Sequence, residues 1–505
     1  MSGRKKKTFI NLFFTVLLEV ASVISGFIIP RLLISTFGSE INGLTQSIAD
    51  FIGYVSLLQT GVGSAIKAAL YKPLAKKDHS TLSVVVKTTE RFFYKIAIVS
   101  VAYILLLALF FQPVLAKNFD YTFTLILVVI IGLSTAAQYF FGITSQMLLE
   151  ADQKSYVYSI VQMGTIVLNT IAVIVSVRLG ASVIVVKAVS AMFFVLRPII
   201  LCIYTRCHYK LDQHVASDNS YIKQRWDAFG QGIAFFLHSK TDIFVLTIFT
   251  SYTDVSIYSV YALVTRGLSS LLNSFEKVIR SAFGNILAND EKGNLKKSFN
   301  AYLTLMHILV TILFATATVT VFAFVKIYTT KVQDANYIQP LFGIIIIAAE
   351  AVYCLRLPYY SIIYAAGKFK ETNRSAYIEA GVNILVSIVL VYKFGLIGVA
   401  IGTFTAMFYR TVAFIVFLSK NILELDIKYQ IKRYIITAIA YVLGVILLSR
   451  LSIDINSYFS WAVYAVSVLI IMSIFTFVVN ILFDKNNTIA SLQFLKIKKT
   501  RPKEN

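Results

Sequence analysis

The chain has 505 residues, of which 57% are hydrophobic and only 14% are charged. One or two water-soluble cores could not bury so large an apolar fraction, so the composition excludes an ordinary soluble globular protein. The formal net charge of +22 would suggest nucleic-acid binding in a soluble chain. In a membrane protein the same charge can instead set the orientation of the helices, so the positions of the basic residues decide between the two interpretations.

Long uncharged stretches predict helices that cross a lipid bilayer. Ile96–Ala116, Tyr121–Leu149 and Ser155–Val177 each meet or exceed the roughly 20 residues needed to span the hydrocarbon. In chain order we predict an all-α integral membrane protein with about fourteen transmembrane helices, near residues 9–37, 41–70, 92–112, 121–149, 155–177, 181–204, 226–250, 254–288, 298–325, 338–366, 374–392, 395–418, 434–449 and 457–483.

The loops between these helices alternate in charge. About 30 of the 47 Lys and Arg residues fall in the termini and the even-numbered gaps, which by the positive-inside rule are cytoplasmic. The basic start at Arg4–Lys7 and the apolar run after it resemble a signal peptide. Because Glu19 interrupts this run, we interpret the run as the first transmembrane span. Both termini are therefore predicted to be cytoplasmic, and nucleic acid is not an expected partner.

The chain resembles itself at a shift of about 213 to 215 residues. Arg178–Gly180 falls on Lys393–Gly395, and Ala191–Phe194 falls on Ala406–Tyr409. Six helices per repeat return the chain to its starting side, which predicts two parallel six-helix lobes followed by two terminal helices. The expected divisions are an N-lobe at 1–205, a cytoplasmic linker at 206–225, a C-lobe at 226–420, two terminal helices at 421–484 and a basic tail at 485–505.

Charged residues inside the predicted spans are the candidate functional residues. A charge at the bilayer centre costs about 2.5 to 3.5 kcal/mol on insertion scales, so such residues usually face a cavity or a partner. Basic residues are in excess among these charges, which predicts a water-filled central cavity that prefers an anion. Arginine suits a phosphate because its planar fork binds two oxygens. The basic candidates for binding a pyrophosphate are Arg31, Lys67, Lys240, Arg266, Arg280 and Arg356, and the acidic candidates for ion coupling or ion pairing are Glu19, Asp50, Asp242, Glu276 and Glu350.

A purely structural alternative stays open for each of these residues. Glu19 would pair with a neighbouring Arg, Lys240 with Asp242, and Glu276 with Arg280 at the i, i+4 spacing. Lys95, Lys187 and Glu379 lie near the ends of predicted spans, where a long side chain reaches water, so no function is assigned to them.

The sequence lacks the motifs of an enzyme that would act at this site. It has no nucleotide-binding loop, nucleophile elbow or His-Glu-x-x-His motif, and its three cysteines have no metal-ligand spacing. We therefore expect a secondary-type transporter without cofactor or metal, driven by an ion gradient, the membrane potential or consumption of its product.

The first eighty residues resemble a known family. Pro30-Arg31-Leu32-Leu33, Ile41-Asn42-Gly43-Leu44 and Gln59-Thr60-Gly61-Val62-Gly63 are similar to the opening of polysaccharide flippases of the multidrug, oligosaccharidyl-lipid and polysaccharide exporter superfamily. The resemblance implies alternating access and the transport of undecaprenyl-pyrophosphate-linked oligosaccharide repeat units across the bacterial cytoplasmic membrane, for capsule, O-antigen or exopolysaccharide synthesis. It also implies contacts with membrane lipids and with a polysaccharide polymerase or other assembly proteins.

The same resemblance assigns roles to particular helices. Related lipid II flippases carry essential arginines on their first and eighth helices, which Arg31 and Arg266 match. The last two helices, at 434–449 and 457–483, would hold the polyprenyl tail in an apolar groove. The alternatives are a cation-coupled multidrug antiporter of the same superfamily, which should favour acidic cavity residues, a membrane polysaccharide polymerase, and a scaffold of an assembly complex.

Overall fold

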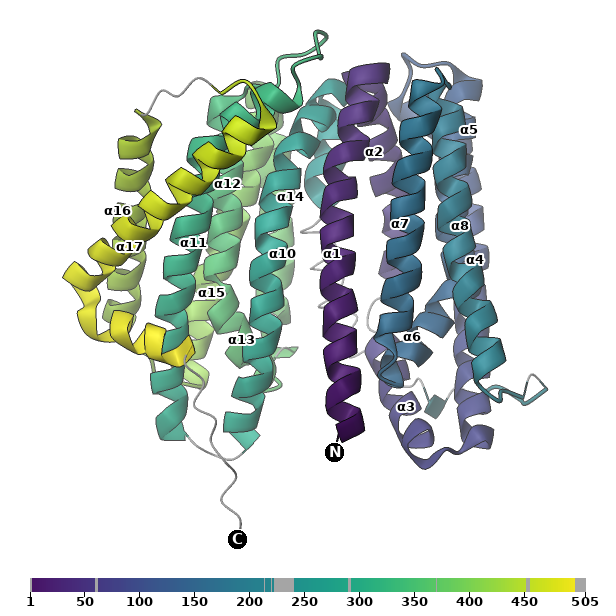
Figure 1. The fold of residues 1–505 in the computed structure, drawn as a ribbon, viewed down its shortest axis with the longest axis horizontal. Coiled ribbons are helices and arrows are strands. Elements are labelled where there is room, and N and C mark those ends of the chain that lie inside the picture. The colour runs from purple at the N-terminus through teal and green to yellow at the C-terminus, as the bar shows by residue number, and fades with distance from the viewer. Residues whose placement is uncertain are drawn as a thin grey trace. The chain divides into compact units, whose positions relative to one another are not determined.

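The fold is described from a computed structural model, in which residues 2–59, 62–212, 214–218, 220–221, 240–288, 292–368, 370–450 and 455–495 are placed. These residues are almost entirely helical (Figure 1). They form two compact units, of which unit 1 comprises Met1–Ser259 with Lys331–Ala335, and unit 2 comprises Val260–Thr330 with Asn336–Asn505. The predicted domain boundaries stay a prediction.

The helices of unit 1 follow one another with short connections. Apolar segments in a bilayer form helices because a helix satisfies its backbone hydrogen bonds internally. They are α1 (Ser2–Phe37), α2 (Ser39–Gly53), the 3₁₀ helix η1 (Tyr54–Gln59), α3 (Val62–Lys76), α4 (His79–Leu115), α5 (Tyr121–Ala137), the π-helix η2 (Gln138–Gly142), α6 (Ile143–Ala151), α7 (Ser155–Arg178) and α8 (Val183–His208). Residues 240–249 are also helical and belong to this unit.

Unit 2 contains most of α10 and all later helices. They are α10 (Tyr252–Ala288), α11 (Lys292–Tyr328), α12 (Pro340–Leu355), α13 (Leu357–Ala365), the 3₁₀ helix η4 (Lys370–Thr372), α14 (Asn373–Phe394), α15 (Leu396–Asn421), α16 (Ile427–Ser449) and α17 (Tyr458–Leu495). Within the unit, α11 packs against both α16 and α17, and α14 packs along α15.

Twelve helices in the described part of the chain are long and apolar enough to cross a membrane. They coincide with twelve of the fourteen predicted spans. Two predicted spans are not among them: 41–70 is divided into α2, η1 and α3, and most of 226–250 lies outside the described residues. The all-α membrane fold is thus confirmed, while the total of fourteen helices stays a prediction.

Large apolar side chains on the outside of the helices agree with a lipid environment. Leu447, Ile474 and Leu482 are 57%, 62% and 74% exposed, as expected where hydrocarbon rather than water is the solvent. Helix α4 has 37 residues, which at about 1.5 Å per residue is longer than the roughly 30 Å hydrocarbon thickness requires.

In both units a helix is interrupted at the same point of the predicted repeat. In unit 1 the break is the π-helix η2, between α5 and α6. In unit 2 it is Arg356, between α12 and α13 and two residues before Pro358. The last helix of each predicted lobe also carries a matching arginine, Arg197 on α8 and Arg410 on α15. Both features support the repeat. By contrast, α1 continues without interruption through Pro30.

Candidate functional site

A buried carboxylate holds a lysine in unit 1. Asp50 lies on α2, and its carboxylate forms an ion pair with Lys240 Nζ. The two side chains differ in exposure, 3% for Asp50 and 29% for Lys240. Lys240 therefore pairs with Asp50 rather than with Asp242, whose Oδ2 accepts a hydrogen bond from Tyr258 Oη at 2.8 Å.

A second ion pair in unit 1 joins Lys67 of α3 to Glu150 of α6. Glu150 Oε1 also accepts a hydrogen bond from Gln146 Nε2, at 2.8 Å. The Lys67 side chain is 36% exposed and that of Glu150 24%, so again the basic partner is the more accessible one. On α1, Arg31 is half-buried and Glu19 is exposed.

In unit 2, the predicted i, i+4 pair on α10 is present. Arg280 Nε lies 3.4 Å from Glu276 Oε1, and Ser361 of α13 donates a hydrogen bond of 2.8 Å to the same carboxylate. The Glu276 side chain is 3% exposed and that of Arg280 30%. The guanidinium also lies over the rings of Tyr360 and Tyr364, 5.4 and 5.8 Å from their centroids.

Arg356 belongs to a buried group that the sequence did not reveal. Its Nη1 donates to Glu379 Oε1 at 2.5 Å, and Arg410 Nε lies 3.9 Å from Glu379 Oε2. All three side chains are under 10% exposed. Two guanidiniums share one carboxylate, and Arg410 Nε and Nη1 have no hydrogen-bond partner among the described residues. The group thus carries an excess positive charge.

The two remaining candidates of unit 2 differ in their surroundings. Arg266 on α10 is exposed, whereas Glu350 on α12 is half-buried. Three of the six basic candidates therefore stand in ion pairs with a more buried carboxylate. A fourth, Arg356, is itself buried with its carboxylate.

The terminal helices contain a second charged group, which the predicted bounds 434–449 and 457–483 left out. Arg433 on α16 is fully buried, with Nη1 3.7 Å from Asp484 Oδ2 and Nη2 donating to the Thr304 carbonyl oxygen at 3.3 Å. Asp484 stands where α17 changes direction, with φ −154° and ψ 58°. Helices α16 and α17 extend past the predicted spans and so include both charges.

No cluster of three or more His, Cys, Asp or Glu side chains that could hold a metal ion occurs in the described ranges. Within each unit the candidate residues form ion pairs, and in unit 2 Arg280 and Arg356 also lie over aromatic rings. Such an arrangement binds and releases anions or exchanges ion-pair partners.

Solved structures with the same fold belong to membrane transporters. A structure described as the lipid II flippase MurJ in an inward closed conformation has a TM-score of 0.69 and 15% identity, and the match covers 92% of this chain and 98% of MurJ. An inward-facing multidrug resistance MATE family transporter of the MOP superfamily has a TM-score of 0.61 and 11% identity, with 81% and 96% covered.

A third structure, of the MATE multidrug transporter DinF-BH in complex with a ligand, has a TM-score of 0.59 and 13% identity, with 83% and 97% covered. No protein-family model matches the chain, and no curated protein matches it. The chain therefore has the fold of MurJ and the MATE transporters, over nearly their whole length.

Proposed function

We propose that this protein is a flippase that carries undecaprenyl-pyrophosphate-linked oligosaccharide repeat units across a bacterial cytoplasmic membrane for surface polysaccharide synthesis. The fold shared with a lipid II flippase over 92% of the chain supports a transporter of lipid-linked precursors. The sequence resemblance in residues 30–63 supports the polysaccharide branch.

One observation carries the proposal of an anionic substrate. In three ion pairs the acid is the deeper partner and the base the more exposed one: Glu150 and Lys67, Asp50 and Lys240, and Glu276 and Arg280. A carboxylate that lies deeper than its basic partner and holds it in one orientation presents the cationic head of that partner to a ligand. A diphosphate can then contact the lysine or arginine without first removing its counter-ion.

Arg31 and Arg266 are the residues that we expect to contact the pyrophosphate most strongly. Arg266 is exposed on α10, and Arg31 is half-buried on α1. A guanidinium binds two phosphate oxygens in parallel, and each charge-assisted hydrogen bond contributes roughly 1.5 to 3 kcal/mol.

Coupling to an energy source would use the acidic partners. Asp50 has one carboxylate oxygen against Lys240 and the other, Oδ2, without a hydrogen-bond partner among the described residues. Substrate that binds Lys240 would weaken the pair and favour a proton or cation at Asp50. Transport then proceeds by alternating access, in which the substrate path opens to one side of the membrane at a time.

A binding measurement tests the assigned arginine. The Arg266→Ala variant should bind a fluorescent polyprenyl-pyrophosphate oligosaccharide at least about tenfold more weakly than the wild type, because a charge-assisted contact is lost. Arg178→Ala is the control, since Arg178 is exposed at the end of α7 and outside the candidate set. Equal affinity of the two variants would remove Arg266 from the site.

A further inference from the structure

Unit 1 contains a pocket that the proposed transport site does not use. It has a volume of about 820 Å³ and lies between α4, the η2–α6 segment, α8 and residues 211 and 215–217. Its lining includes Lys87, Glu90 and Arg91 of α4, and Arg206 of α8. All of these elements belong to one compact unit, so the pocket is a property of unit 1 alone.

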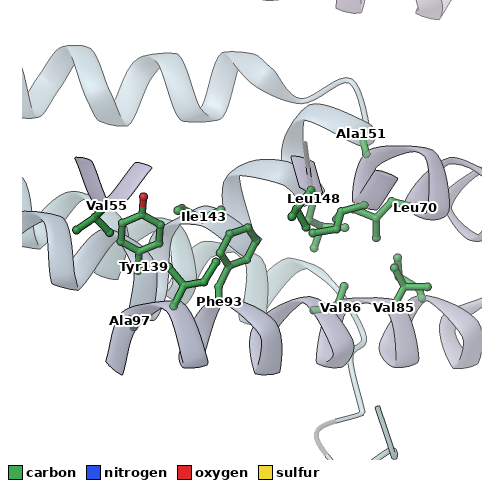
Figure 2. Packing of buried hydrophobic residues seen from close by; sticks show 14 residues of the cluster. Val55, Leu70, Val85, Val86, Phe93, Ala97, Tyr139, Ile143, Leu148 and Ala151 are labelled. Carbon is green, nitrogen blue, oxygen red and sulfur yellow. The ribbon is translucent and has the colours of Figure 1, made fainter. Parts of the chain in front are cut away.

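The inner wall of this pocket is part of a packed core. Val86 and Leu148 line the pocket and also belong to the cluster that joins α4 to η2 and α6. Figure 2 shows side chains of this cluster, among them Val85, Val86 and Leu148. Close packing behind the pocket fixes its shape, because displacing core side chains is costly.

The segment after α8 forms a further wall and is fastened to α4 by hydrogen bonds. The Asp212 amide donates to Ser83 Oγ at 3.0 Å, and Arg91 Nη1 donates to Ser217 Oγ at 3.0 Å. Just beyond this wall, the Asp218 amide donates to Thr88 Oγ1 at 2.8 Å. The pocket is thus enclosed by polar contacts on this side.

The charge pattern of α4 and α8 indicates that the pocket lies near the level where the hydrocarbon begins. The uncharged run of α4 starts at Ile96, one to three turns after the pocket's charged residues, and Arg206 follows the uncharged residues 198–205 of α8. Three basic side chains, Lys87, Arg91 and Arg206, face one acid, Glu90. The phosphates of a bilayer occupy this level, and each basic residue near the surface attracts them by about 1 kcal/mol.

Toward the hydrocarbon the lining is aromatic. Tyr94 and Phe141 line the pocket and are 55% and 46% exposed. Ile98, one turn after Tyr94 on α4, and Ile203, next to Cys202 on α8, are 51% and 57% exposed. These two side chains extend the apolar surface beyond the pocket. A soluble anion would need only the basic end, whereas an amphiphile uses both ends.

We propose that this pocket binds an anionic glycerophospholipid, with its phosphate at Arg91, Lys87 and Arg206 and its acyl chains along Tyr94 and Phe141. Because the segment after α8 forms one wall of the pocket, the bound lipid also holds this segment in place. The site is separate from the pyrophosphate site proposed above and does not depend on the identity of the transported substrate.

Binding of phosphatidylglycerol to the full-length chain in detergent, followed by native mass spectrometry, tests the site. Arg206→Ala should lower the affinity about fivefold and Glu90→Gln should raise it by a similar factor, because they remove a basic and an acidic group respectively. Arg178→Ala, at the end of α7, is the control and should leave the affinity unchanged. A gain of affinity in Glu90→Gln cannot arise from misfolding.

Cys202 reports whether the lipid occupies this pocket rather than the general lipid-facing surface. It lines the pocket, whereas Cys207 is exposed outside it and Cys354 is buried. In a Cys207→Ser background, phosphatidylglycerol should slow thiol labelling of Cys202 at least threefold, while phosphatidylcholine and inorganic phosphate should not. The proposal is overturned if the three additions act alike, if phosphate alone protects, or if Arg206→Ala and Arg178→Ala bind equally.

Discussion

At the scale of single residues, the buried group of Arg356, Glu379 and Arg410 is the least expected feature. Its three members come from the helix break after α12, from α14 and from α15. One carboxylate balances only one of the two guanidiniums, and arginine cannot lose its proton in a protein. The group is therefore stable only while Glu379 is ionised and in place.

Replacing Glu379 tests this dependence. Glu379→Gln should destabilise the protein by about 3 to 5 kcal/mol, because two buried guanidiniums lose the carboxylate that they share. Chemical unfolding in lipid–detergent micelles measures the change. The control is Glu371→Gln, which breaks an exposed pair with Lys368 at 3.1 Å and should have little effect on stability, because water screens exposed ion pairs. Similar losses in both variants would show that the buried group is not stabilised by its carboxylate.

Sequence reasoning identified some of the residues that carry buried charge, among them Asp50, Glu276 and Arg356, but few of their partners. The Glu276 and Arg280 pair followed from helical spacing alone. The pairs of Asp50 with Lys240 and of Lys67 with Glu150 join distant parts of the chain, so no local pattern contains them. Glu379 was set aside as a residue near a helix end, although it is buried between two arginines.

At the scale of helices, the tight packing of α14 on α15 depends on two glycines. A Cβ added at Gly402 would clash with Ser387 Oγ, and one at Gly398 would meet the Leu390 backbone at 2.5 Å. Glycines spaced four apart let two helix backbones approach closely in a membrane.

Gly402→Ala should therefore destabilise the protein by about 1 to 3 kcal/mol, because the helices must separate. Gly381→Ala, in α14, is the matched control: an added Cβ there meets nothing within 4 Å, so alanine should stabilise the helix by about 0.5 to 1 kcal/mol. The same unfolding measurement gives both values. A change of the same sign in both variants would contradict the close helix contact.

Helix existence was predictable, whereas helix bounds and irregularities were less so. Twelve spans follow from apolar length alone, since the bilayer imposes a minimum on each. The predicted span 41–70 is interrupted by η1, a short 3₁₀ segment that begins directly after Gly53. Helix α16 begins at Ile427 rather than near 434, because Asp426 caps it by accepting from the Lys428 amide at 2.9 Å.

At the scale of the whole molecule, the central claim is that an internally repeated transporter fold carries a phosphate-linked lipid. The equivalent breaks at η2 and Arg356, and the equivalent arginines Arg197 and Arg410, support the repeat. The fold is shared by a lipid II flippase and by multidrug transporters, so it does not by itself select between an anionic lipid and an organic cation. In three ion pairs the basic partner is more exposed than the acid, which favours the anion.

Transport by the purified chain in lipid vesicles tests that claim most directly. A fluorescent polyprenyl-pyrophosphate oligosaccharide is placed in one leaflet, and its appearance in the other is followed by a membrane-impermeant quencher. We predict movement that depends on the protein, that an unlabelled pyrophosphate-linked lipid inhibits, and that ethidium, an organic cation, does not. Export of ethidium without any movement of the lipid-linked oligosaccharide would contradict the account and identify a multidrug exporter instead.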